Sequence, residues 1–284
     1  MRVYICPALP DWILLMVLFA VSYGAGDRGV TVRQLTWLGG ILQLAYMVAS
    51  LASGLLLSRR NAWPILVAST AASVLTGVAC VVAVDFGPLL VAMSLLGAAS
   101  GFFFNSFQCF MRGEAPAGGL ARATALYTLA WSGGCSLGLL ASGSFYRLGP
   151  LVLDGLTVLV GIVILGILTL HKERPHDEPS AEEHTEHGPE SAAAVDRAYL
   201  WVGWIMIFTA MFAQRPLHTF HPAISAKQGV SPALASLFVC EWFMKRAESV
   251  AAMYAVCGGA LIISAMAQWG VASFGRARRA ANPV

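Results

Sequence analysis

The stretch HKERPHDEPSAEEHTEHGPESAAAVDR, residues 171–197, is the only long polar segment in a chain that is otherwise rich in apolar residues. Eight of the fifteen acidic residues lie in it, together with three prolines and almost no large apolar side chain. A segment of this composition cannot bury enough surface to fold by itself. We therefore expect a disordered linker between residues 1–170 and residues 198–284.

Outside this linker the composition is that of a membrane protein. The chain has 284 residues, of which 57% are hydrophobic and 12% are charged, whereas soluble proteins have roughly 25% charged residues. The lipid bilayer is therefore an expected partner, and no nucleic-acid partner is expected. The six cysteines form no CxxC pair and fall mostly in apolar runs, which favours buried thiols over disulfides or metal ligands.

Six apolar runs precede the linker, and each has roughly the 17 residues or more that a helix needs to cross a bilayer. The runs are residues 9–24, 35–57, 63–84, 88–110, 120–145 and 150–170. The first run follows Arg2 and is also compatible with a signal peptide, but the spans that come directly after it favour an uncleaved helix.

Two convincing runs follow the linker, at residues 198–213 and 250–274. The run between them, residues 233–244, contains Glu241 and is too short for an ordinary span. The sequence therefore predicts an all-α, polytopic membrane protein with about eight spans, in which a six-helix bundle precedes an incomplete C-terminal half.

The distribution of basic residues predicts the orientation. With eight spans and a cytoplasmic N-terminus, eleven of the eighteen Lys and Arg residues lie on the inner side. Adding residues 233–244 as a ninth span changes this balance to ten against eight. The excess of Lys and Arg on cytoplasmic loops thus favours eight spans in the cell inner membrane, with both termini and the linker in the cytoplasm.

The segment GLLLSRRNA, residues 54–62, joins the second and third expected spans. It resembles the loop at this place in the major facilitator superfamily, whose members usually have two six-helix bundles around a central substrate site. Gly54 and Arg59 match the family pattern. Ser58 stands where the family has an aspartate, and Asn61 stands where it has a glycine.

In that family the loop contributes to a cytoplasmic gate between helices. The resemblance therefore implies a gate role for Gly54, Arg59 and Arg60, although the missing aspartate puts the gate's usual charge contact in doubt. A short turn with two arginines on the cytoplasmic side explains Arg59 and Arg60 equally well.

The fifth expected span is also similar to the family's glycine-rich fifth helix, through Tyr127, Trp131, Gly134 and Gly138. Gly134 and Gly138 form a small-xxx-small pair that lets another helix approach closely, and packing is their expected role. The proline of the family's antiporter motif is absent.

Residues 208–237 resemble the family's seventh helix and the turn into its eighth, so the likeness covers about the first 237 residues. The chain then runs almost directly to a final helix, about four spans short of the family's two six-helix halves. This pattern indicates a chain that is internally shortened in its C-terminal half.

Polar side chains within spans are costly in lipid and mark candidate substrate contacts. In the fourth span, Asn105, Gln108 and Arg112 follow i, i+3, i+7 and share one helix face. Hydrogen bonding between helices is the alternative for the first two residues, and an end charge is the alternative for Arg112. The further candidates are Gln43 and Tyr46 in the second span, Tyr127 and Trp131 in the fifth, and Gln214 and Arg215 after the seventh.

No catalytic motif, metal site or cofactor site is expected. The histidines of the linker are irregularly spaced in a flexible segment, and no hydrolase, metalloprotease or nucleotide-binding motif occurs. Asp11 and Asp154 lie near span ends, so the sequence does not identify a coupling ion.

The resemblance implies a transporter that moves a small solute by alternating access, without covalent chemistry. Three alternatives remain open. The chain could be a shortened, transport-inactive relative, or a half-size carrier that completes its cavity as a homodimer. A membrane enzyme would need a cluster of acids, bases or metal ligands at one membrane face.

Overall fold

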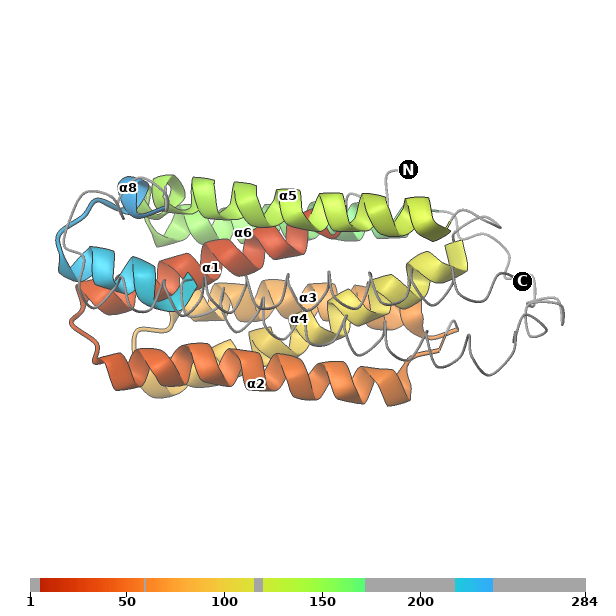
Figure 1. The fold of residues 1–284 in the computed structure, drawn as a ribbon, viewed down its shortest axis with the longest axis horizontal. Helices are drawn as coiled ribbons and strands as arrows, with labels where there is room; N and C mark the ends of the chain where they lie inside the picture. Colours follow the sequence, from red (N-terminus) through yellow and green to blue (C-terminus); the bar gives the residue numbers. More distant parts are fainter. Residues whose placement is uncertain (1–5, 59, 115–119, 172–217, 237–284) are drawn as a thin grey trace, which may run out of the picture. The chain divides into compact units, whose positions relative to one another are not determined.

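The computed structural model describes residues 6–58, 60–114, 120–171 and 218–236, all of which belong to one compact unit (Figure 1). These residues form helices and turns, without strands, so the all-α prediction is confirmed. The helices are α1 (Ala8–Asp27), α2 (Val32–Leu56), α3 (Ala62–Val82), α4 (Phe86–Glu114), α5 (Leu120–Arg147), α6 (Pro150–Thr169), a helical segment at residues 218–227, and α8 (Pro232–Ser236).

Part of the predicted architecture lies outside the described residues. This applies to the expected linker after His171, to the spans at residues 198–213 and 250–274, and to most of the short run at residues 233–244. The division into a six-helix half, a linker and a shortened half stays a prediction.

Five of the described helices are long and apolar enough to cross a membrane, namely α1, α2, α3, α4 and α6. Each coincides with an expected span to within about one helical turn. Helix α5 is 28 residues long but is not among the five, because serines, threonines and glycines dilute its apolar residues.

Helix α2 begins before the apolar run that predicted it. Thr31 forms a capping box with Gln34: the Gln34 amide nitrogen donates to the Thr31 hydroxyl over 3.3 Å, and the Thr31 amide nitrogen donates to the Gln34 side-chain oxygen over 3.1 Å. These bonds satisfy amide groups that have no partner within the helix. The helix therefore starts at Val32, and a short loop is enough to reverse the chain after α1.

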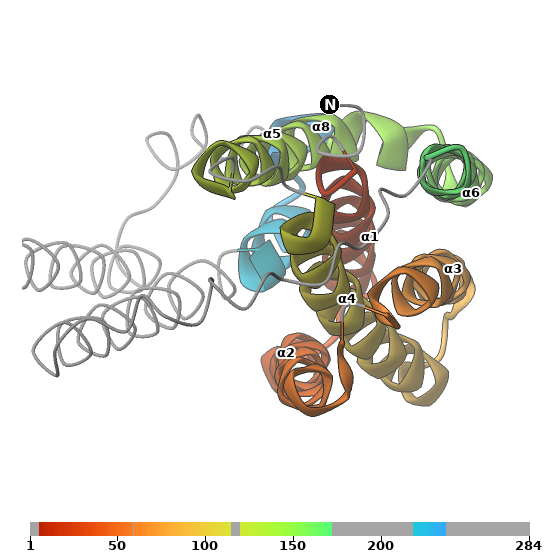
Figure 2. The same cartoon turned by 90° about the vertical axis from the view of Figure 1, so that its right-hand side faces the viewer.

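Helix α1 lies in the middle of the described helices (Figure 2). It packs against α5, α3, α6 and α4. In its most apolar stretch of 18 residues, 83% of the residues are buried, compared with 22% in the corresponding stretch of α2. Helix α2 instead leaves large apolar side chains exposed, including Leu44, Leu51 and Leu55. A helix that is apolar on all sides is expected to be buried, whereas an exposed apolar face suits contact with lipid.

Glycines set the distance between α1 and α5. A methyl group added at Gly134 would lie 2.1 Å from the Ala8 carbonyl oxygen, and one added at Gly138 would lie 3.0 Å from the Trp12 Cα. These separations leave no room for a side chain at Gly134. The prediction that this small-xxx-small pair admits a neighbouring helix is therefore confirmed, and the neighbour is α1.

We expect Gly134→Ala to lower the free energy of unfolding by about 1–3 kcal/mol, because overpacking forces the two backbones apart. The matched control is the adjacent Gly133, where an added methyl group meets no atom within 4 Å. Gly133→Ala should be neutral or gain up to about 1 kcal/mol through helix propensity. Thermal unfolding of the two variants in detergent measures the difference, and equal midpoints would contradict the close packing of α1 on α5.

Candidate functional site

A pocket of about 340 Å³ lies where α2 and α4 end side by side. This volume is at the small end of the roughly 300–1,000 Å³ range of ligand sites. The residues that line this α2–α4 pocket are Ser50, Ser53, Gly54 and Leu57 from α2 and its end, and Asn105, Gln108, Cys109 and Arg112 from α4.

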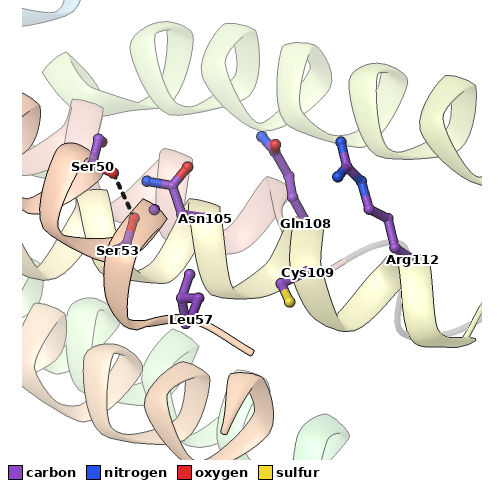
Figure 3. Close-up of a pocket in the computed structure, with 8 residues that line it drawn as sticks. Ser50, Ser53, Leu57, Asn105, Gln108, Cys109 and Arg112 are labelled. Atoms are coloured by element: carbon purple, nitrogen blue, oxygen red, sulfur yellow. Dashed lines mark hydrogen bonds between the residues drawn. The ribbon is translucent and has the colours of Figure 1, made fainter. Parts of the chain in front are cut away.

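Helix α4 contributes the three polar residues that the sequence placed on one face. Asn105, Gln108 and Arg112 all line the pocket, so their predicted common face is confirmed. Figure 3 shows Gln108 and Arg112 extending from the same side of α4, while Asn105 reaches toward Ser50 and Ser53 of α2.

The side-chain amide of Asn105 is incompletely bonded. Its Nδ2 atom is buried and has no hydrogen-bond partner among the described residues. A buried donor without a partner costs about 1–3 kcal/mol. The pocket wall therefore carries an amide group that an acceptor atom of a bound molecule could satisfy.

Gln108 connects the pocket to α5. Its Nε2 atom donates to the Tyr127 hydroxyl over 3.2 Å, and the Tyr127 ring stacks on Phe107 with centroids 5.8 Å apart. Trp131 is half-buried and packs against the main core cluster. Neither Tyr127 nor Trp131 lines the pocket, but Tyr127 is bonded to Gln108, which does.

The two candidate residues on α2, Gln43 and Tyr46, lie about two helical turns before the α2 residues that line the pocket. Gln43 and Tyr46 are half-buried and do not line the pocket. They follow the same i, i+3, i+7, i+10 stripe as Ser50 and Ser53, which do line it. The two serines were not among the expected site residues, and this continuing stripe is the sequence signal that could have identified them.

Asp11 is a buried acid that the sequence reasoning set aside as a residue near a span end. It is 3% exposed and lies in the first turn of α1. Acids inside membrane proteins are rare and usually functional. Asp11 could have been identified from the sequence, because it is the only acidic residue in the first apolar run, residues 9–24.

The turn after α2 is closed by the two residues that depart from the family pattern. The Asn61 side-chain oxygen accepts from the Ser58 amide nitrogen over 2.6 Å, and Asn61 Nδ2 donates to the Leu56 carbonyl oxygen over 2.7 Å. Gly54 lines the pocket beside this turn, Arg60 is exposed, and Arg59 lies outside the described residues. Neutral hydrogen bonds thus hold the turn where the family has an aspartate.

At the opposite end of the helices, residues 218–236 are held against α1 and the loop that follows it. The Tyr23 hydroxyl donates to the Val230 carbonyl oxygen over 2.5 Å, and Lys227 Nζ donates to the Val30 carbonyl oxygen over 2.8 Å. A methyl group at Gly26 would lie 2.3 Å from the Ala223 carbonyl oxygen. The two backbones therefore touch.

The same segment also contacts α5 at this end. The Ser236 hydroxyl of α8 lies 3.3 Å from the Leu140 carbonyl oxygen, to which it can donate, and α8 packs along α5. We call these contacts of residues 218–236 with α1, α5 and the α1–α2 loop the closed end (Figure 1). Gln214 and Arg215, the remaining candidates, lie outside the described residues.

Among the described residues, no group of three or more His, Cys, Asp or Glu side chains is arranged to hold a metal ion. The polar groups around the pocket are amides, hydroxyls and one guanidinium. Such groups can bind a solute by hydrogen bonding and charge.

Comparison with known proteins identifies one family. The family model of the Major Facilitator Superfamily matches residues 4–281, and no curated protein matches the chain. The match corrects the expectation that the likeness ends near residue 237, because it continues through most of the C-terminal part. Since the family model covers almost the whole chain, the protein belongs to the Major Facilitator Superfamily of membrane transporters.

Proposed function

We propose that the protein moves a small solute across the cell inner membrane by alternating access. The observation that supports this most directly is the difference between the two ends of the described helices. One end is closed by residues 218–236, and the other end contains the α2–α4 pocket. A carrier that binds solute from one side at a time needs this asymmetry.

The orientation of this state follows from the basic residues. The pocket end carries Arg60 and Arg112 and is the end to which the sequence assigns eleven of the eighteen Lys and Arg residues. By the positive-inside rule it faces the cytoplasm. The arrangement is then a state closed toward the periplasm, in which Asn105 and Gln108 face a pocket near the cytoplasmic surface.

The closed end must open for the solute to cross. Its polar contacts are a few hydrogen bonds, each contributing about 1 kcal/mol. Packing adds to these bonds, because the Gly26 backbone touches Ala223, and Phe19 and Tyr23 form an apolar cluster with Ala226, Ala235 and Val230. Opening this gate therefore has to separate the apolar cluster as well as the hydrogen bonds.

Removing one gate hydrogen bond should shift the protein toward the state open to the periplasm. We expect Tyr23→Phe to change the ratio of the two states by roughly fivefold, which corresponds to about 1 kcal/mol. The reporter is Cys109 in the pocket wall, as the sole cysteine, labelled with an impermeant maleimide in inverted vesicles. Its labelling rate from the cytoplasmic side should fall in Tyr23→Phe.

Tyr146→Phe is the matched control for this experiment. Tyr146 packs on Tyr23 with ring centroids 5.1 Å apart, and its hydroxyl makes no hydrogen bond within the described part of the chain. Its removal should leave Cys109 labelling unchanged. Equal labelling in Tyr23→Phe and the parent protein would count against a gate at this end.

Transport itself is measured by counterflow of labelled solutes in proteoliposomes. We expect at least one small polar solute to accumulate, and Gln108→Leu to reduce the rate by roughly tenfold because a hydrogen bond worth about 1.4 kcal/mol is lost. Thr128→Val is the control, since the Thr128 hydroxyl donates only to its own helix at the Thr124 carbonyl oxygen. A folded protein that moves no solute would favour the transport-inactive alternative.

A further inference from the structure

The α2–α4 pocket is lined by a basic residue and neutral polar residues. Its lining includes an arginine, two amides and two serines, and none of its eight residues is an acid. Arg112 forms no salt bridge with any described residue, and its side chain is exposed at the pocket. A pocket that offers a cation and no carboxylate is suited to a negatively charged ligand.

The donors that are available for a ligand can be separated from those already used. Gln108 Nε2 donates to Tyr127, and the Ser53 hydroxyl donates to the Ser50 carbonyl oxygen over 2.8 Å. Asn105 Nδ2 is buried without a partner among the described residues. On α4, the Asn105 amide nitrogen, which is itself buried, and the Arg112 guanidinium therefore make no hydrogen bond with a described residue.

Arg112 alone has a simpler explanation. A basic residue in the last turn of a helix is stabilised by the helix dipole, and α4 has Arg112 in that turn. This explanation does not apply to Asn105, which lies two turns earlier and is half-buried, with a buried Nδ2 atom. A bound ligand with acceptor atoms would engage both groups.

The spacing of the two donors limits the ligand. Seven residues of helix rise by about 10.5 Å, and long side chains on a helix lean back toward its N-terminus. The guanidinium of Arg112 can therefore lean toward the level of Gln108, but a single compact oxyanion cannot reach both donors. A ligand with an acceptor oxygen at each end of a short chain can reach both.

We propose that the α2–α4 pocket binds a small organic acid, with a carboxylate on Arg112 and a second oxygen, several ångströms away, on Asn105. A carboxylate and a guanidinium form two parallel charge-assisted hydrogen bonds. The inference rests on the proposed function in taking this acid as the transported solute. The same chemistry could come from an anionic lipid headgroup, so the experiment separates the two sources.

Protection of Cys109 from alkylation tests the proposal without a transport assay. Cys109 lines the pocket, and the other five cysteines are replaced by alanine. The protein is placed in phosphatidylcholine nanodiscs, and the alkylation rate is measured with succinate, its neutral diamide succinamide, or inorganic phosphate. We expect succinate to slow alkylation at least threefold, phosphate to act less, and succinamide to have no effect.

Variants then assign the effect to the two donors. Arg112→Gln should abolish protection by succinate, Arg112→Lys should retain part of it, and Asn105→Leu should weaken it. Arg122→Gln is the control, because Arg122 is exposed at the start of α5 and does not line the pocket; it should keep full protection. Unfolding midpoints show whether each variant is folded. If Arg112→Gln does not fold, Arg112→Lys is used in its place to test the role of the guanidinium.

Three results would overturn the proposal: no protection by succinate, equal protection by succinamide, or full protection in Arg112→Gln. A fourth result would also overturn the proposal and would assign the pocket to a lipid headgroup. In that case Cys109 alkylation is slower in phosphatidylglycerol nanodiscs without any added acid, and succinate slows it no further. The gate experiment remains independent. If Tyr23→Phe still shifts Cys109 labelling while succinate gives no protection, alternating access stands and the organic-acid site fails.

Discussion

The close contact of α1 with its neighbours is the constraint on which the rest of the described structure depends. Helix α1 is buried on nearly all sides, and in a bilayer apolar burial between helices supplies little driving force, so that packing must come from small residues that let backbones touch. Gly134 provides this contact at one end of α1, and Gly26 provides it at the other. The same helix therefore joins α5 to the segment 218–236.

This position gives α1 two functional connections. Near its start, Ala8 and Trp12 pack against Gly134 and Gly138 of α5, and Tyr127 of α5 accepts a hydrogen bond from Gln108 of the pocket lining. Near its end, Tyr23 holds the segment 218–236. Helix α1 is therefore packed at its start against α5, the helix that is bonded to the pocket lining, and near its end against residues 218–236.

The sequence predicted the helices and their polar faces better than it predicted which residues contact one another. Hydrophobic length placed the six helices from α1 to α6, and helical spacing placed Asn105, Gln108 and Arg112 on one face. Gln43 and Tyr46 were named as polar residues of the second span, but the pocket lies about two turns further along α2, at Ser50 and Ser53. Helical periodicity predicts which side of a helix is polar. The position of a pocket along that helix depends on where the neighbouring helix ends.

Other features depend on contacts between distant segments, for which a single sequence has no signal. The burial of Asp11 requires the packing of α5 on α1, and the closed end requires residues 218–236 to return to α1 from across the expected linker. By contrast, Ser58 and Asn61 were recognised as departures from the family loop, but that they bond the same turn emerged only from the structure.

That turn has a consequence for the conditions under which the protein can work. In place of an acid, it is closed by a hydroxyl, an amide and backbone groups, none of which changes its protonation at physiological pH. Hydrogen bonds between neutral groups are also little affected by ionic strength, in contrast to exposed ion pairs. The end of α2 beside the pocket is therefore held with the same strength in acidified and saline surroundings, and any response of the carrier to pH has to originate elsewhere in the chain.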